Sequence, residues 1–94
     1  MMSKRNKLIA AICAAPSILG RLELLRGRKA ICFPGFEQDL IGAELAEADE
    51  RVVTDGNITT SRGMGTSIDL GLELVRLLIG AEKANELAKS TQYL

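Results

Sequence analysis

Short apolar runs alternate with segments of helical periodicity along this chain of 94 residues. Residues 8–12 (LIAAI) form a continuous apolar run, which is typical of a strand covered on both faces. Pro16 stands where a helix can begin, and isoleucine and leucine then recur at helical spacing as far as Gly27. Residues 29–33 (KAICF) predict a second strand, which a Pro-Gly dipeptide ends.

The middle of the chain is acidic and is followed by a hairpin pattern. Residues 36–51 carry six carboxylates and one arginine, and their apolar positions predict a short helix with a solvated outer face. β-Branched runs at residues 51–55 and 58–61 flank a Gly-Asn dipeptide that follows Asp55. This pattern indicates an antiparallel hairpin.

A long apolar helix is predicted near the C-terminus. A glycine-rich loop leads into it, and Thr66 with Asp69 three residues later predicts a capping box. Its few charged side chains fall on one narrow stripe, so we expect the helix to be buried on several sides, against a sheet and against another helix or a subunit. We expect Gly80 to end it and residues 81–89 to form a last, more exposed helix.

Strands that alternate with helices, plus one hairpin, predict an α/β sandwich with a largely parallel sheet. About four strands are expected, and the first is the most apolar. Burying Leu8, Ile9 and Ile12 is worth about 1.5–3 kcal/mol each, so this strand needs neighbours on both edges. Residues 1–94 are therefore predicted to be a single partial domain, the second half of a larger one.

Composition argues against several classes of function. Twelve basic and twelve acidic residues balance to a formal charge of zero, which argues against a nucleic-acid partner and a polybasic membrane surface. Histidine is absent, so the chain cannot supply a Ser-His-Asp triad, a Cys-His dyad or a His-liganded zinc site. We expect no metal and no cofactor.

The N-terminal twenty residues imitate a secretory signal, because basic residues precede an uncharged stretch. Pro16 interrupts that stretch, and no small-x-small cleavage site follows it. A membrane-spanning helix would need about 20 apolar residues. Cys13 and Cys32 fit neither a disulfide scaffold nor a cysteine-rich metal site. These features predict a reduced, cytoplasmic protein.

Cys13 is the strongest candidate for chemistry. A strand ends there and a helix begins almost directly, which is the arrangement of a nucleophile elbow. The positive end of the helix dipole would lower the pKa of the thiol, and backbone N–H groups there could stabilise an oxyanion. The alternative is that Cys13 is a small buried hydrophobic residue, which is the favoured interpretation of Cys32.

The glycine-rich segment at residues 61–67 (SRGMGTS) is the second candidate. Glycines before a helix N-terminus suit a bound anion or a close approach of backbone. A third glycine of a dinucleotide site is missing, and no Gly-Lys-Ser/Thr follows, so a P-loop is excluded. A tight turn is at least as good an interpretation.

Two motifs together resemble those of a known superfamily. Residues 8–17 (LIAAICAAPS) and, after the hairpin, residues 55–69 (DGNITTSRGMGTSID) are similar to the C-terminal half of the ThiJ/PfpI superfamily, which includes the parkinsonism-associated deglycase and its bacterial relatives. The resemblance implies a flavodoxin-like sandwich and usually a homodimer. By position it implies that Cys13 is the nucleophile and that the backbone of Ala14 donates to the oxyanion. The pocket loop would consist of Arg62, Gly63, Met64 and Gly65.

Three departures from the pattern of the superfamily bear on activity. The N-terminal half, with the acidic side chain that hydrogen-bonds the reactive thiol, has no counterpart in this sequence. Phe33 occupies a place where some members carry histidine, and Met64 occupies one where the loop usually has proline. The first departure bears most on the activity of this chain alone.

The leading hypothesis is the C-terminal segment of a ThiJ/PfpI-like protein that uses the Cys13 thiolate on small reactive carbonyls, in glyoxalase-like or deglycase-like chemistry, or as an oxidative-stress thiol. Its partners would be a small aldehyde or oxidant, and either a second copy or a separate N-terminal half. An alternative is an inactive fragment that serves as an assembly module, suggested by the apolar strand and the apolar helix. A glutamine-amidotransferase-like subunit fits less well, because those enzymes pair the cysteine with histidine.

Overall fold

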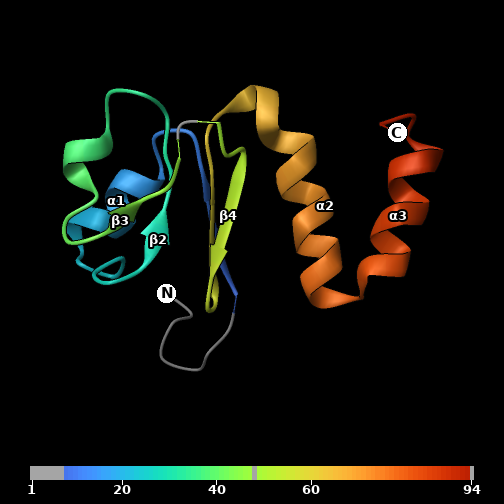
Figure 1. Ribbon diagram of the computed structural model, residues 1–94, viewed down its shortest axis with the longest axis horizontal. Helices are drawn as coiled ribbons and strands as arrows, with labels where there is room; N and C mark the ends of the chain where they lie inside the picture. The colour runs from blue at the N-terminus through green and yellow to red at the C-terminus, as the bar shows by residue number, and fades with distance from the viewer. Residues whose placement is uncertain (1–7, 48, 94) are drawn as a thin grey trace.

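The computed structural model describes residues 8–47 and 49–93. A three-stranded sheet with the order β1–β5–β4 lies at its centre (Figure 1). β1 (Ile9–Ile12) runs parallel to β5 (Ile58–Ser61), and β4 (Val52–Asp55) runs antiparallel to β5. The sheet therefore contains one parallel and one antiparallel pair.

One side of the central sheet carries the middle of the chain. A six-residue helix, α1 (Pro16–Arg21), lies there together with the 3-10 turn η2 (Glu37–Asp39). Beside them, β2 (Lys29–Ala30) pairs in parallel with β3 (Glu44–Leu45) (Figure 1). Two of the three strand pairings are thus parallel, and the predicted α/β class with a mostly parallel sheet is confirmed.

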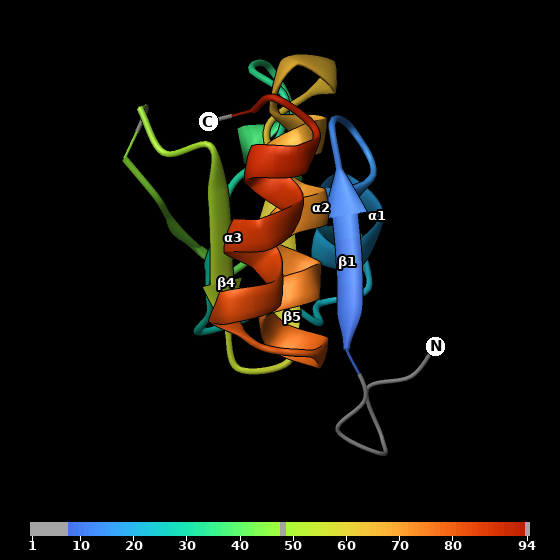
Figure 2. The same cartoon turned by 90° about the vertical axis from the view of Figure 1, so that its right-hand side faces the viewer.

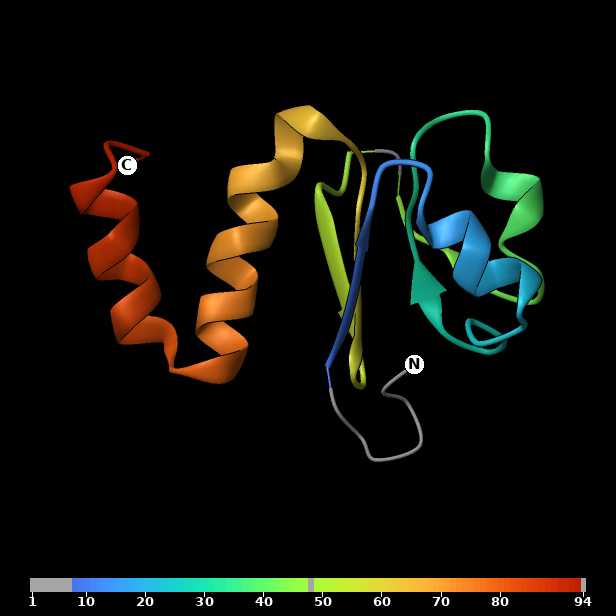
Figure 3. The same ribbon diagram turned by 180° about the vertical axis from the view of Figure 1, so that it is seen from behind.

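The other side of the sheet carries the C-terminal helices. The 3-10 turn η3 (Met64–Thr66) leads into α2 (Ser67–Leu78), which packs on β4 and β5. α3 (Ala81–Ser90) packs on α2 and lies farther from the sheet (Figure 3). No helix among the described residues is long and apolar enough to cross a membrane.

The hydrophobic core lies between the central sheet and the α1 side. Its buried residues are Ala11, Leu19, Leu25, Ala30, Cys32, Leu40 and Ile58. α2, in contrast, contains no fully buried residue, and Ile68, Leu78 and Ile79 are exposed on or just after it. α2 packs on the sheet and on another helix, α3, as predicted, but the prediction that it is buried on several sides is wrong. Within the described ranges, only the sheet, η3 and α3 make substantial contact with it.

The central strand β5 is buried along its whole length although three of its four residues are polar. Each hydroxyl has a partner: Thr59 bonds to Thr54 at 2.9 Å, Thr60 Oγ1 accepts from the N–H of Ile31 at 3.0 Å, and Ser61 bonds to Thr66 at 2.6 Å. Burying a hydroxyl is costly unless it is hydrogen-bonded. These partners allow a polar sequence to occupy the middle of the sheet.

The hairpin and the C-terminal helices are confirmed. Asp55 pairs with Ile58 across a two-residue turn, and Gly56 has a φ of +64°, which glycine adopts without steric cost. α2 ends before Gly80, whose φ is +133° and whose N–H bonds to the carbonyl of Val75 at 3.1 Å. α3 begins at the next residue, as predicted.

The first helix and the second strand are shorter than predicted. α1 ends at Arg21, and turns follow in which Glu23 has a φ of +60°. These turns place Leu25 in the core, where it is fully buried. β2 stops after Ala30, and the N–H of Ile31 bonds to the side chain of Thr60 in the central sheet.

The predicted helix in residues 36–51 is wrong. This segment forms η2 and the short strand β3, with a turn between them at Gly42, whose φ is +75°. The predicted capping box is also wrong. Thr66 Oγ1 donates to the carbonyl of Gly63 at 2.9 Å, and Asp69 pairs with Arg51 at 2.9 Å. Both groups that would cap α2 are thus engaged elsewhere.

β1 and β4 form the two edges of the central sheet (Figure 2). In the part of the chain that the structure describes, β1 pairs with β5 alone. Ala11 is buried whereas Ala10 is exposed. Among the described residues, the most apolar strand of the sequence is therefore an edge strand and lacks the second strand neighbour that its sequence predicts.

Candidate functional site

Cys13 occupies the turn between β1 and α1 with a φ of +65°. Residues other than glycine rarely adopt this left-handed conformation, and holding one there costs about 1–3 kcal/mol. Two backbone hydrogen bonds hold it: its N–H donates to the carbonyl of Ser61 at 3.1 Å, and its carbonyl accepts from the N–H of Phe33 at 2.8 Å. The side chain is half-buried. The predicted strand–turn–helix geometry is present, with the thiol accessible at the end of the sheet.

The backbone after Cys13 offers a hydrogen-bond donor. The N–H of Ala15 bonds to the carbonyl of Ile12 at 3.1 Å, and the carbonyl of Ala14 accepts from the N–H and the hydroxyl of Ser17 at 3.0 and 2.6 Å. No acceptor for the N–H of Ala14 lies within the described ranges. This N–H therefore has no partner among the described residues, and its role as an oxyanion donor stays a prediction.

The two cysteines lie in different environments. Cys32 is 2% exposed and belongs to the core, and burial raises the pKa of its thiol, with a further contribution from the Glu37 carboxylate. A raised pKa keeps the thiol protonated and inert. Cys13 is half-buried, and none of the described side chains hydrogen-bonds to its sulfur. Of the two thiols, Cys13 is the more accessible one, and its reactivity stays a prediction.

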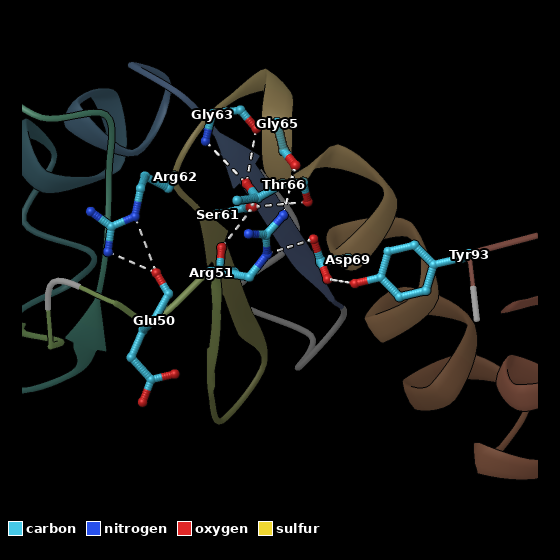
Figure 4. Close-up of polar contacts among 9 residues, drawn as sticks. All are labelled: Glu50, Arg51, Ser61, Arg62, Gly63, Gly65, Thr66, Asp69 and Tyr93. Atoms are coloured by element: carbon cyan, nitrogen blue, oxygen red, sulfur yellow. Dashed lines mark hydrogen bonds and ion pairs between the residues drawn. The ribbon is translucent and has the colours of Figure 1, made fainter.

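The glycine-rich loop folds around Thr66 (Figure 4). Thr66 Oγ1 accepts from the N–H of Gly63 at 3.1 Å and contacts Ser61 Oγ at 2.6 Å. Gly63 is buried, and a Cβ at this position would lie 3.4 Å from the ring of Phe33. Met64 is 88% exposed. The loop lies at the same end of the sheet as Cys13, since Ser61 and Phe33 contact both (Figure 3).

The side chain of Arg62 is committed to a structural contact. Its guanidinium donates to the carbonyl of Glu50 at 2.7 and 3.1 Å (Figure 4). It also donates to the carbonyl of Glu47 at 3.4 Å. It also lines a cavity of about 170 Å³ that includes Cys32 and Glu37. Arg62 thereby holds the segment before β4. Its role beside Cys13 stays a prediction.

A second polar cluster was not found from the sequence. Arg51 donates to Asp69 Oδ2 at 2.9 Å and to the carbonyl of Gly65 at 2.9 Å, and the hydroxyl of Tyr93 donates to Asp69 Oδ1 (Figure 4). The three side chains are separated by up to 42 positions and match no motif, so nothing in their spacing could have signalled the contact. For metal ligation, no group of three Cys, Asp or Glu side chains comes together in residues 8–47 and 49–93.

Comparison with known proteins gives this geometry a context. The model of the DJ-1/PfpI family matches residues 1–77. The chain belongs to the DJ-1/PfpI family. Protein DJ-1alpha of Drosophila melanogaster is 43% identical over 86 residues, and a deglycase of Pyrococcus abyssi is 39% identical over 77 residues. The match covers 92% and 82% of this chain but only 40% and 46% of those two relatives.

Solved structures of DJ-1/PfpI proteins have the same fold over the same extent. Drosophila melanogaster DJ-1beta superposes with a TM-score of 0.88 at 36% identity, over 97% of this chain and 49% of that one. Oxidized Toxoplasma gondii DJ-1 gives a TM-score of 0.88 at 34% identity, over 97% and 49%. The chain thus spans about half the length of these relatives.

Proposed function

We propose that Cys13 is the reactive thiol of a DJ-1/PfpI protein that acts on small reactive carbonyls. The observation that carries this proposal is the left-handed φ of +65° at Cys13, between a strand and a helix, with the unbonded N–H of Ala14 beside it. A strained residue at such a turn is what a nucleophile elbow requires. Relatives described as deglycases support the substrate class.

The first chemical step is addition of the thiolate to an aldehyde. Cys13 Sγ bonds to the carbonyl carbon, the π electrons of the C=O bond move to oxygen, and the N–H of Ala14 stabilises the oxyanion. Protonation by water gives a hemithioacetal without any change in oxidation state. For a 2-oxoaldehyde, a proton then moves from the former aldehyde carbon to the adjacent one as electrons shift to the second carbonyl. Water hydrolyses the resulting thioester, which releases a 2-hydroxy acid and the free thiol.

The proton transfers need groups other than histidine, which this chain does not contain. No carboxylate among the described residues hydrogen-bonds to Cys13. We infer that water and an acidic side chain from the remainder of a complete domain carry these protons. The addition step requires no such group, so it can be tested in this chain alone.

Oxidation is a second reaction open to the same thiol. Attack of the thiolate on a peroxide forms a sulfenate and releases water or an alcohol. The partial exposure of Cys13 supports it, and one similar structure is that of an oxidized protein. Peroxide and aldehyde would then compete for one sulfur.

Protection of Cys13 from alkylation tests the addition step. The purified chain is treated with iodoacetamide with and without methylglyoxal, and mass spectrometry of peptides separates the two thiols. We expect methylglyoxal to slow alkylation of Cys13, and Cys32, buried in the core, to react slowly in either case. Equal alkylation of Cys13 with and without the aldehyde would reject the proposal.

Turnover tests the complete reaction. In a complete DJ-1/PfpI protein that contains this sequence, loss of methylglyoxal and formation of lactate should fall to background in Cys13→Ser, because a serine hydroxyl is a far weaker nucleophile without an adjacent base. Cys32→Ala is the matched control and should keep the rate of the parent protein. Lactate formation that survives in Cys13→Ser would assign the chemistry to another group.

An assembly module is the second candidate function, and the uncovered surfaces favour it. β1 has one strand neighbour in the described part of the chain, and Ile68, Leu78 and Ile79 are 56%, 69% and 68% exposed. Exposed apolar surface of this kind is typical of interfaces. Pairing with a second copy or with the other half of the domain would cover it. Sedimentation of the chain as a folded monomer over a wide concentration range would argue against self-association.

A further inference from the structure

Three side chains from different parts of the chain meet at the start of α2. Arg51 precedes β4, Asp69 lies in the first turn of α2, and Tyr93 follows α3. The guanidinium of Arg51 bridges Asp69 and the carbonyl of Gly65, each at 2.9 Å, and the Tyr93 hydroxyl donates to the other oxygen of Asp69 (Figure 4). Asp69 is thus clamped by two donors on a side chain that is only 16% exposed.

We propose that Arg51, Asp69 and Tyr93 form a latch that positions the Gly63–Thr66 loop beside Cys13. All three are positioning residues, since none of them touches the sulfur. The latch deepens the proposed function and rests on it only for the identity of the substrate. The effect of the latch on the surroundings of the Cys13 thiol does not depend on which substrate binds.

Arg51 connects the latch to Cys13 by two routes. Its guanidinium holds the loop at the carbonyl of Gly65, and its own carbonyl accepts from Ser61 Oγ at 3.0 Å. The carbonyl of Ser61 in turn accepts from the N–H of Cys13 at 3.1 Å. A shift of Arg51 would therefore move both the loop and the end of β5 that fixes Cys13. Discrete hydrogen-bonded chains of this kind can carry coupling between distant positions.

Tyr93 gives the latch its outer member. The N–H of Tyr93 bonds to the carbonyl of Ala88 at 2.8 Å, which folds the end of the chain back toward α2. The hydrogen bond to Asp69 raises the pKa of the Tyr93 phenol, against a smaller opposing effect of Arg51. The other charged groups lining the same groove are Asp49, Glu50, Glu73 and Arg76. At neutral pH the Tyr93 phenol keeps its proton and Asp69 stays ionised. The hydrogen bond between them therefore forms, and the latch is closed.

The only tyrosine of the chain is Tyr93, and there is no tryptophan. The change in near-ultraviolet absorbance on ionisation of the phenol therefore comes from Tyr93, with no contribution from another tyrosine or from tryptophan. In the parent chain we expect the phenol to titrate above the ordinary tyrosine value of about 10. Asp69→Asn should bring the midpoint back toward that value. Glu73→Gln, which removes a carboxylate from the same groove but no partner of Tyr93, should leave the midpoint in place.

The rate of Cys13 alkylation measures the effect on the thiol. We expect Tyr93→Phe and Asp69→Asn to speed alkylation by iodoacetamide about twofold or more, the low end of coupling between networked residues. The same variants should weaken protection of Cys13 by methylglyoxal, because a loosened loop opens the sulfur to reagents while holding the aldehyde less well. Arg51→Lys keeps the charge but cannot bridge two acceptors with one planar fork, so it should behave as Asp69→Asn does.

Arg76→Gln is the matched control. It breaks an ion pair of similar geometry, with Arg76 and Glu73 at 2.7 Å on the same helix, that does not contact the loop. It should leave both the alkylation rate and the protection unchanged. Urea unfolding of each variant verifies that alkylation is measured on folded protein.

The outcomes separate the latch from the proposed function. Alkylation that is unchanged in Tyr93→Phe and Asp69→Asn overturns the latch, as does an equal change in Arg76→Gln. If methylglyoxal fails to protect Cys13 in the parent chain, the proposed function fails, and faster alkylation in the latch variants still supports the latch. A phenol that titrates identically in the parent and in Asp69→Asn overturns the contact on which the latch depends.

Discussion

The N–H of Cys13 donates to the carbonyl of Ser61 at 3.1 Å, so the residue that ends β5 fixes the turn that carries the thiol. The register of the two parallel strands continues into this contact, since Ile12 pairs with Ser61. Ser61 is also the first residue of the glycine-rich segment. The elbow and the loop are therefore parts of one structure, although 48 positions separate Cys13 from Ser61 in the sequence.

Ser61→Ala tests the importance of this junction for stability. Ser61 is completely buried, and its hydroxyl bonds to the carbonyl of Arg51 at 3.0 Å and to Thr66 Oγ1 at 2.6 Å. Its removal takes one partner from the carbonyl of Arg51 and one from the buried hydroxyl of Thr66, and we expect the free energy of unfolding to fall by about 1–3 kcal/mol. Urea titration measures the change. Ser90→Ala, which removes an exposed hydroxyl, should have an effect within about 0.5 kcal/mol.

Replacement of Cys13 by two small residues tests the backbone conformation at the elbow. Glycine reaches positive φ readily, whereas alanine is penalised by about 1–2 kcal/mol in the left-handed region. We therefore expect Cys13→Gly to be more stable than Cys13→Ala in urea unfolding. Lys83, an exposed residue of α3, provides the matched pair. At this position the free energy of unfolding of the alanine variant should exceed that of the glycine variant by about 1 kcal/mol. The same order at both positions would contradict the φ of +65°.

Substitution by alanine should change the stability in opposite directions at two helical glycines. A Cβ on Gly20 in α1 would overlap the carbonyl oxygen of Asp39 and would lie 2.6 Å from the Cα of Leu40. Because these are backbone atoms, Gly20→Ala should destabilise the chain by about 1–3 kcal/mol. A Cβ on Gly71 in α2 has no atom within 4 Å, and Gly71→Ala should stabilise by up to about 1 kcal/mol. Thermal unfolding of the two variants measures both signs.

The elements that the sequence predicted correctly are those with local signals. The Asp-Gly-Asn hairpin, the end of α2 at Gly80 and the turn at Cys13 each depend on residues within a few positions of one another. The helix predicted in the acidic segment, residues 36–51, is wrong because the structure of this segment depends on distant residues. Its apolar residues fit a helix, but Leu40 is buried against the core through a turn, and Glu44 and Leu45 pair with β2. Pairing between distant segments overrides local propensity, and the sequence alone does not reveal it.

The candidate site also has one part with a local sequence signal and another part that depends on contacts between distant residues. The turn at Cys13 could be predicted because strand–turn–helix is a local pattern, while the chemical roles of Cys13 and Ala14 stay predictions. Asp69 was assigned to a capping box, whereas it bonds to Arg51 and Tyr93, 18 and 24 positions away. Arg62 was placed in the pocket loop, and its guanidinium donates to the carbonyls of Glu47 and Glu50. Long polar side chains can reach many acceptors, so sequence spacing does not determine which one they choose.

The free energy of unfolding should depend on pH through the protonation of Asp69 and Tyr93. Burial acts to raise the pKa of Asp69, but hydrogen bonds from Tyr93 and Arg51 outweigh it and lower the pKa overall. A carboxylate whose pKa is lower in the folded state contributes stability above its unfolded value of about 3.9. That contribution is lost as the pH falls through the folded pKa.

The phenol acts with the opposite sign. The hydrogen bond to Asp69 raises the pKa of Tyr93, so its contribution is complete below about pH 10 and disappears as the pH rises through the folded pKa. The contact between the two should therefore stabilise the chain between about pH 4 and pH 10. Outside this window, one of the two groups has changed its protonation state.

A pair of variants measures this window. The free energy of unfolding in urea is determined for the parent chain and for Asp69→Asn across the pH range. We expect the difference between them to be largest near neutral pH and to shrink at both ends. Glu82→Gln serves as the control, because the Glu82 side chain makes no ion pair or hydrogen bond to any described residue. A difference between parent and Asp69→Asn that stays constant from acid to alkaline pH would show that Asp69 and Tyr93 do not stabilise the fold through their charges.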